Sequence, residues 1–195
     1  MNDNLIDFFN EVNLPEKYYE ACITNNIITY FKERRNIVVY PFSVSQRVEK
    51  EEGYDFGYEL KGKSFLIQYK KPLKSGENYR WDVDIEQLNA IINNGYGEVT
   101  YYALPQFEDY KKWYSALSDE NTKFLSAIEV FKYLNSSGKK SINSSWSGLK
   151  TWEQAVLNLF PGSNFKSAIL KENIENVSVF NRIIQFEGIV CYEIE

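Results

Sequence analysis

Apolar residues recur every three or four positions between residues 16 and 35, which is the spacing of one face of an α-helix. The stripe consists of Tyr19, Cys22, Ile23, Ile27, Tyr30 and Phe31. Asn13 stands three residues before Glu16, as in a capping box, and Pro15 suits a first helical turn because its missing N–H costs nothing there. The pattern predicts an amphipathic helix that begins near residue 14 and buries this stripe.

A second pattern, the alternation of apolar and polar residues, occupies residues 54–60 and 64–70. It predicts two strands joined at Lys61-Gly62. The other segments up to residue 105 read as a strand at 36–42 that ends at Pro41, a polar connection at 43–53, a loop at 71–80, a helix at 82–95 and a strand at 98–105. This order of helices and strands predicts an α/β or α+β fold, with helices packed on a mixed sheet.

The segments after residue 105 favour helices over strands. The patterns predict helices at 109–119, 122–138 and 150–160, a polar loop at 139–148, and one or two strands within 181–195. No internal repeat or low-complexity linker interrupts the chain. We therefore expect one domain over residues 1–195, with residues 106–195 as a helical C-terminal elaboration of unknown role.

Composition restricts the chemistry. The chain of 195 residues contains no histidine, which excludes a Ser-His-Asp triad, a Cys-His pair and a His-ligated metal. The net charge of -5 argues against nonspecific coating of nucleic acid. Cys22 and Cys191 are expected in the core rather than in a disulfide scaffold or a zinc site. The sequence shows no membrane-spanning run and no secretory signal, so we expect a cytoplasmic protein.

Polar side chains gather on one face of the predicted hairpin. Counting outward from a turn at Lys61-Gly62 places Asp55 opposite Gln68, and directly opposed residues have Cβ atoms about 5 Å apart. Lys70 lies one same-face position beyond Gln68. Carboxylate and amide oxygens can share Mg²⁺, and a lysine can stabilise charge on a phosphate. The alternative is an ordinary solvent-facing side of a hairpin.

The stretch "GYDFGYELKGKSFLIQYKK" resembles the core motif of PD-(D/E)XK nucleases, in the QxK form of Mrr-like restriction endonucleases. Asp55 is followed, after twelve residues, by "QYK", and the apolar "FLI" precedes it. Two features depart from the majority pattern: no proline stands directly before Asp55, and Gln68 replaces an acidic residue. The resemblance covers residues 14–105.

The resemblance implies a restriction-endonuclease-like mixed sheet flanked by helices and a metal-dependent endonuclease. Mg²⁺ or Mn²⁺ would be held by Asp55, Gln68 and Glu20, with Glu16 as the second choice for the helix glutamate. Lys70 would complete the catalytic set. The substrate implied is nucleic acid, most directly DNA, in restriction or anti-phage defence.

Several residues near this motif are candidates for supporting roles. Lys71, Lys74 and Arg80 could contact phosphates, although a solvated loop explains them equally well. Gln87 could assist Lys70 from the predicted helix at 82–95. The predicted loop at 43–53 is strongly acidic, and we expect Glu49, Glu51 and Glu52 at the surface, with a second metal site as the lesser alternative.

Two other functions stay open at this stage. Because Gln68 is a weaker ligand than a carboxylate, the chain could be a catalytically inactive nuclease-fold module that binds nucleic acid or a partner protein, or that forms a homodimer. The third possibility is an interaction protein whose C-terminal half carries the function.

Overall fold

The computed structural model describes residues 14–60 and 63–159 of the chain. Asn13, Cys191 and the strands expected within 181–195 lie outside the described residues. None of the helices in the described ranges is long and apolar enough to cross a membrane.

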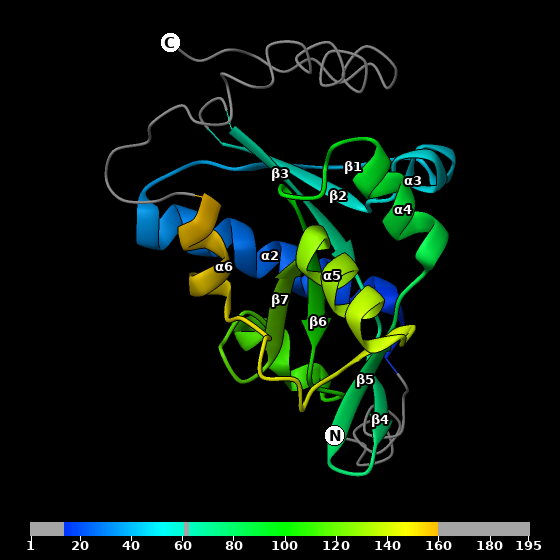
Figure 1. Cartoon of the computed structure of the whole chain (residues 1–195). Helices are drawn as coiled ribbons and strands as arrows, with labels where there is room; N and C mark the ends of the chain where they lie inside the picture. The colour runs from blue at the N-terminus through cyan, green and yellow to red at the C-terminus, as the bar shows by residue number, and fades with distance from the viewer. Residues whose placement is uncertain (1–13, 61–62, 160–195) are drawn as a thin grey trace. The chain divides into compact units, whose positions relative to one another are not determined.

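A five-stranded mixed sheet lies at the centre of the described chain, in the order β1-β2-β3-β6-β7 (Figure 1). Its strands are β1 (Tyr40–Ser43), β2 (Phe56–Leu60), β3 (Lys63–Tyr69), β6 (Thr100–Pro105) and β7 (Thr122–Ser126). β3 and β6 run parallel, and the other neighbours run antiparallel. A smaller antiparallel sheet has the order β4-β5-β8. Its strands are β4 (Leu73–Ser75), β5 (Asn78–Asp82) and β8 (Ser141–Asn143).

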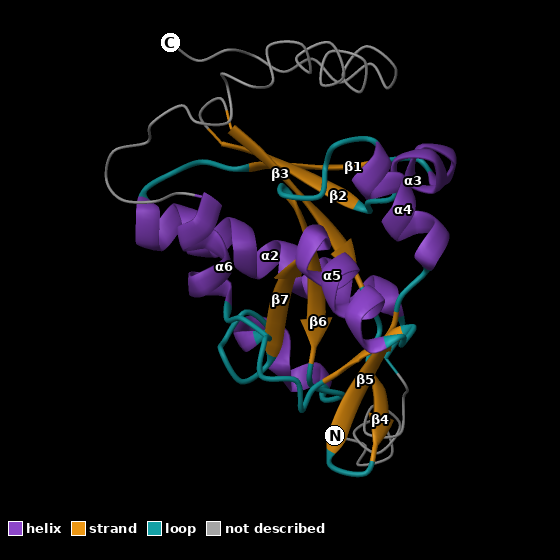
Figure 2. Ribbon diagram, in the orientation of Figure 1, coloured by secondary structure: helices purple, strands orange, loops and turns teal. Residues whose placement is uncertain are grey.

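Helices cover both faces of the larger sheet (Figure 2). The helices are α2 (Glu16–Arg35), α3 (Gln46–Glu52), α4 (Ile85–Asn93), α5 (Ala127–Ser137) and α6 (Trp152–Leu159), and η1 (Tyr110–Ser115) is a 3₁₀ helix. The mixed α/β class predicted from the sequence is confirmed.

The two faces have separate apolar cores. The predicted stripe of α2 is buried, apart from the half-buried Tyr30, and packs on the face that carries Tyr58, Phe65 and Tyr69. On the opposite face, α4 and α5 pack over a cluster that includes Trp81, Leu88, Tyr102, Leu125 and Val130. Side chains of adjacent β3 residues therefore enter different cores.

The hairpin register agrees with the count made from the sequence. Leu60 pairs with Lys63 and Phe56 pairs with Ile67, so the next position outward sets Asp55 against Gln68. The backbone N–H of Asp55 donates to the carbonyl of Ile67 at 3.1 Å, which continues the pairing one residue beyond β2. The predicted register is confirmed.

The start of α2 differs from the expected capping box. Pro15 is the N-cap residue and makes no side-chain cap bond. The Glu16 carboxylate instead accepts a hydrogen bond from the backbone N–H of Lys71 at 3.1 Å. Glu16 therefore attaches the first turn of α2 to the chain that leaves β3.

Three assignments before residue 105 are wrong. Pro41 lies inside β1 rather than ending a strand, which is possible because β1 is an edge strand and needs no hydrogen bond from that nitrogen. The polar connection at 43–53 contains α3, whose Arg47 and Glu51 are spaced as an i,i+4 ion pair at 3.8 Å. The loop at 71–80 is the β4–β5 hairpin, stabilised by pairing with the distant β8.

Strands also occur between residues 106 and 159, where we expected only helices and loops. Residues 122–126 form β7 instead of the first turn of a helix, because this short apolar run pairs along β6. Within the predicted polar loop, residues 141–143 form β8. The expected helices are otherwise present as η1, α5 and α6, so the described part of the elaboration supplies strands to both sheets.

Candidate active site

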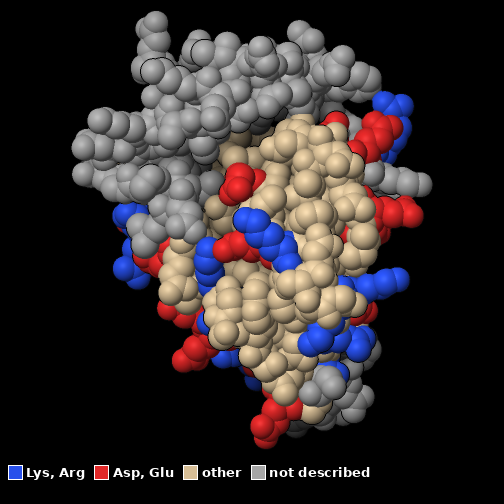
Figure 3. All heavy atoms as spheres, viewed as in Figure 1, with Lys and Arg blue, Asp and Glu red and all other residues tan. Residues whose placement is uncertain are grey.

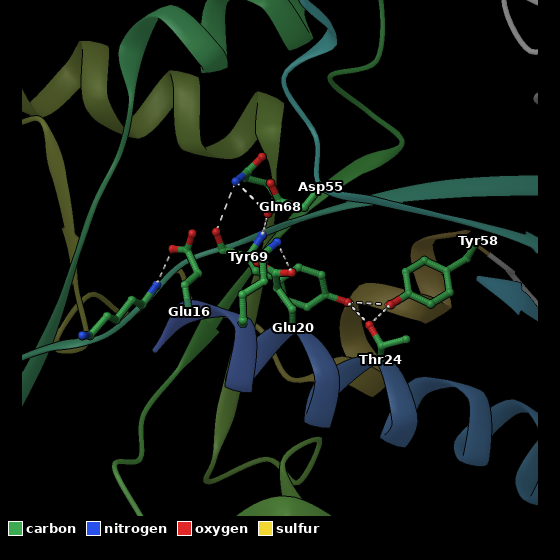
Figure 4. Close-up of polar contacts among 9 residues, drawn as sticks. Glu16, Glu20, Thr24, Asp55, Tyr58, Gln68 and Tyr69 are labelled. Carbon is green, nitrogen blue, oxygen red and sulfur yellow. Dashed lines mark hydrogen bonds and ion pairs between the residues drawn. The ribbon is translucent and has the colours of Figure 1, made fainter. Parts of the chain in front are cut away.

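Asp55 and Gln68 form a hydrogen-bonded pair at the open end of the β2–β3 hairpin (Figure 4). The Nε2 amide of Gln68 donates to Oδ2 of Asp55 at 2.8 Å, and the backbone N–H of Tyr69 donates to the same oxygen at 2.6 Å. Both side chains are buried. The hairpin register therefore holds an Asp–Gln pair below the surface, as the count from the turn predicts.

Burial changes the acidity of Asp55. Loss of water raises the pKa of this carboxyl group to about 8, although the Tyr69 N–H and the Lys70 charge both act to lower it. The charges of Glu49 and Glu20 raise it further. A nearby cation is the partner that would favour the ionised form of such a carboxyl group.

Gln68 has one polar atom that the fold does not satisfy. Its Nε2 donates to Asp55 and to the backbone carbonyl of Tyr69 at 3.2 Å. Its Oε1 is buried and has no hydrogen-bond partner within the described part of the chain. A buried oxygen without a hydrogen-bond partner lowers the free energy of unfolding by about 1–3 kcal/mol. An unpaired oxygen of this kind is a suitable atom for binding a ligand.

Lys70 follows Gln68 at the end of β3 and is held from two sides. Its Nζ donates to Oε1 of Gln87 on α4 at 3.1 Å and lies 5.9 Å from the centre of the Tyr102 ring. Gln87 therefore lies beside Lys70, where the sequence suggested a supporting role, and that role stays a prediction. Tyr102 is the register neighbour of Gln68 on β6, so the ring and the amide lie on the same face of the sheet.

Glu20 reaches the site from α2, on the other side of β3 (Figure 4). Its carboxylate is buried and accepts a hydrogen bond from Nζ of Lys17 at 2.8 Å. Its charge is close enough to raise the pKa of Asp55. Glu16, the second choice for this role, is exposed and engaged with Lys71, so Glu20 is the better placed of the two.

The oxygen atoms of Asp55 and Gln68 suit a hard cation. Within residues 14–60 and 63–159, no group of three or more Asp, Glu or Cys side chains is placed to hold a metal ion. Asp55 and Gln68 together offer a carboxylate and an unsatisfied amide oxygen, which are ligand types that Mg²⁺ and Mn²⁺ accept. The oxygen chemistry of Asp55 and Gln68 therefore fits such an ion.

The three predicted phosphate-binding residues have unequal surroundings. Lys74 lies 3.5 Å from Glu108, and Arg80 lies 3.2 Å from Asp82. Lys71 lines an open hollow of about 420 Å³ beside Lys70. Acidic residues share the lining of that hollow, and Figure 3 likewise shows basic and acidic atoms side by side on one face. Lys71 is the one of the three that forms no ion pair with the described residues.

Sequence reasoning missed Lys17 and placed Glu49 at the surface. Lys17 bonds to Glu20, and the half-buried Glu49 acts electrostatically on both Asp55 and Lys17. The i,i+3 spacing of Lys17 and Glu20 on one helix was the sequence signal that could have revealed Lys17. The position of Glu49 depends on α3, which the sequence pattern did not reveal.

Comparisons with known proteins give one structural likeness. No family model matches the chain, and no curated protein matches it. One solved structure, described as D212, a nuclease from a fusselovirus, superposes with a TM-score of 0.48 and 11% sequence identity. The superposition covers 68% of this chain and 82% of that chain. None of these results assigns the chain to a family.

Proposed function

We propose that this protein is a metal-dependent nuclease that hydrolyses phosphodiester bonds. The observation that carries the proposal is the buried, unpartnered Oε1 of Gln68 beside the Asp55 carboxylate. Polar atoms in an interior are normally paired, so an amide oxygen left without a partner beside a buried carboxylate favours a ligand site over a structural contact.

The chain's own groups divide the work among them. Asp55, Gln68 and Glu20 would hold Mg²⁺ or Mn²⁺, which supplies polarisation of the phosphate and a more reactive water. Lys70 would stabilise the charge that develops on the phosphate, since its ammonium group is fixed between Gln87 and the Tyr102 ring. Because that position is preorganised, Lys70 pays little reorganisation cost during the reaction.

Nucleic acid is the proposed substrate, and DNA is the first to test. The support is the similarity of the "QYK" stretch and its Asp55 partner to the QxK form of the PD-(D/E)XK motif, together with a fold of mixed α/β class. A role in restriction or anti-phage defence extends the same resemblance. Lys71, beside Lys70, is the first candidate for a contact with a neighbouring phosphate.

The direct test is cleavage of single- and double-stranded DNA and RNA by the full chain in Mg²⁺ or Mn²⁺. Wild type should cleave at least one of these substrates, chelation should stop the reaction, and Asp55→Asn should lose it. Lys32→Met, which removes an exposed charge from the far end of α2, is the matched control and should retain activity. Equal cleavage by wild type and Asp55→Asn would refute the site.

A second function, a nuclease-fold module without activity, is favoured by one observation. Gln68 donates its amide N–H to Asp55, so a hydrogen-bond donor already occupies the carboxylate that a metal would need. Gln68→Glu decides between the two readings. An active wild type supports the nuclease, whereas metal binding or cleavage that appears only in Gln68→Glu supports the inactive module.

A further inference from the structure

An ammonium group already stands beside the carboxylates of the candidate site. Nζ of Lys17 lies 2.8 Å from Oε2 of Glu20, one turn along α2. The Lys17 side chain is 81% exposed, whereas the Glu20 side chain is 7% exposed. The pair is therefore not an ordinary surface ion pair, because an exposed side chain bonds to a buried carboxylate.

Three carboxyl groups act electrostatically on Lys17: that of Glu20, which bonds to it, and those of Asp55 and Glu49. They come from α2, from the residue before β2 and from α3.

Burial explains why Glu20 takes this partner. A carboxylate removed from water is costly unless an opposite charge accompanies it. Lys17 can supply that charge because i and i+3 side chains lie on the same side of a helix. A bound Mg²⁺ or Mn²⁺ would supply the same charge, and repulsion between two cations disfavours having both at one carboxylate.

We propose that Lys17 is a tethered counter-ion of Glu20 in the metal-free protein. To bind at Glu20, a divalent cation must displace the Lys17 ammonium group. The inference rests on the proposed metal site and adds a competing group to it. Removing the Lys17 charge should therefore strengthen metal binding, whereas loss of a simple structural contact would weaken it or leave it unchanged. The long exposed stem of Lys17 allows the ammonium group to swing away without a change of backbone.

The experiment compares Mn²⁺ affinity by calorimetry in four full-length proteins: wild type, Lys17→Met, Lys17→Arg and Lys32→Met. Lys17→Arg keeps the positive charge, and Lys32→Met removes an equal charge from the same helix about 22 Å away. We expect Lys17→Met to bind Mn²⁺ about fivefold or more tightly than wild type, and both control variants to bind like wild type. Thermal unfolding gives a second readout without catalysis: Lys17→Met should melt lower than wild type in chelator and gain more from Mn²⁺.

The opposite results separate the two proposals. If wild type binds Mn²⁺ and Lys17→Met binds no more tightly, the counter-ion role is wrong and the metal site stands. If wild type, Lys17→Met and both controls all fail to bind Mn²⁺, the metal site is wrong and the competition falls with it. Should Lys17→Met fold poorly, Lys17→Gln repeats the test with a polar side chain that keeps similar length.

Discussion

Two groups of buried polar side chains lie on opposite faces of β3 and differ in how fully they are hydrogen-bonded. On the α2 face, the hydroxyl groups of Thr24, Tyr58 and Tyr69 bond to one another, with Thr24 2.8 Å from each tyrosine oxygen (Figure 4). On the α4 face, Oε1 of Gln68 and the hydroxyl of Tyr102 have no partner within the described residues. Tyr69 thus belongs to a group of hydroxyls that bond to one another, whereas the adjacent Gln68 has an oxygen without a hydrogen-bond partner.

The contrast separates polar groups that stabilise the fold from those available to a ligand. Each hydroxyl carries one donor, so three bonds among three hydroxyls use every donor of the α2-face network. No hydroxyl donor remains there for a ligand. On the other face, unmet hydrogen-bonding capacity lies beside a carboxylate and an ammonium group, which is the condition that a bound ion and a phosphate would relieve.

The largest expected effect comes from comparing one substitution on each face of β3, one that lowers the cleavage rate and one that lowers the melting temperature. Lys70→Met should reduce the cleavage rate by about 10²-fold or more, because charge stabilisation at the phosphate is lost, while the melting temperature changes little. Tyr58→Phe should do the reverse, keeping the cleavage rate and lowering the melting temperature. Steady-state cleavage and thermal unfolding of both variants test the exchange, and a Lys70→Met protein as active as wild type contradicts it.

The pH dependence of stability should also distinguish the faces. Because the folded state raises the pKa of Asp55 from 3.8 to about 8, the folded protein holds this proton more tightly than the unfolded chain. The stabilisation is present in full below about pH 4 and is lost as pH rises through about 8. The slope due to Asp55 is at most about 1.4 kcal/mol per pH unit.

Urea unfolding in chelator between pH 4 and 8.5 measures this slope. Asp55→Asn should flatten it, because the amide does not titrate, and Thr24→Val should leave it in place. Identical slopes in wild type and Asp55→Asn would show that Asp55 has an ordinary pKa.

A smaller loss is expected from opening the hydroxyl network. Thr24→Val keeps the shape of the side chain and leaves a buried tyrosine hydroxyl short of a partner, at a cost of about 1–2 kcal/mol in the free energy of unfolding. Thr24→Ser retains the hydroxyl and should cost less. Mn²⁺ affinity should be the same in both variants, and a change in Thr24→Val alone would link the two faces.

The smallest effects concern the basic residues at the rim. Lys74 and Arg80 each have a carboxylate nearby, so Lys74→Ala and Arg80→Ala should change DNA affinity less than about threefold. Lys71→Ala should weaken DNA binding more and reduce the salt dependence by about one phosphate contact. Binding isotherms at several salt concentrations distinguish these cases, and equal losses in all three variants would indicate a continuous basic surface.

The hairpin was predictable because its signals are local. The alternation of apolar and polar residues predicted the two faces, and counting from a turn at Lys61-Gly62 predicted the register that pairs Asp55 with Gln68. The apolar stripe predicted the helix that carries Glu20, whereas the choice of Glu20 itself came from the resemblance to PD-(D/E)XK nucleases. The same local reasoning located α4 and thereby the contact of Gln87 with Lys70.

The missed elements depend on distant partners. β4 and β5 are short and largely exposed, and β5 pairs with β8, some sixty residues later in the chain. β7 is a short apolar run whose strand form is decided by β6. Glu49 could not be placed near Asp55 without α3, and the Gln68 amide orientation has no sequence signal at all.

Pro41 has a consequence for the behaviour of the protein in concentrated solution. Among the described strands, β1 is the last on its side of the sheet, and the exposed Val38 and Tyr40 precede Pro41 in the chain. An apolar sheet edge of this kind invites a strand from another molecule to extend it, and chains joined in this way grow into fibrils. Because Pro41 offers no N–H, a strand that paired with β1 would have one carbonyl group without a hydrogen-bond donor. The sheet therefore resists polymerisation at the edge that carries the exposed Tyr40.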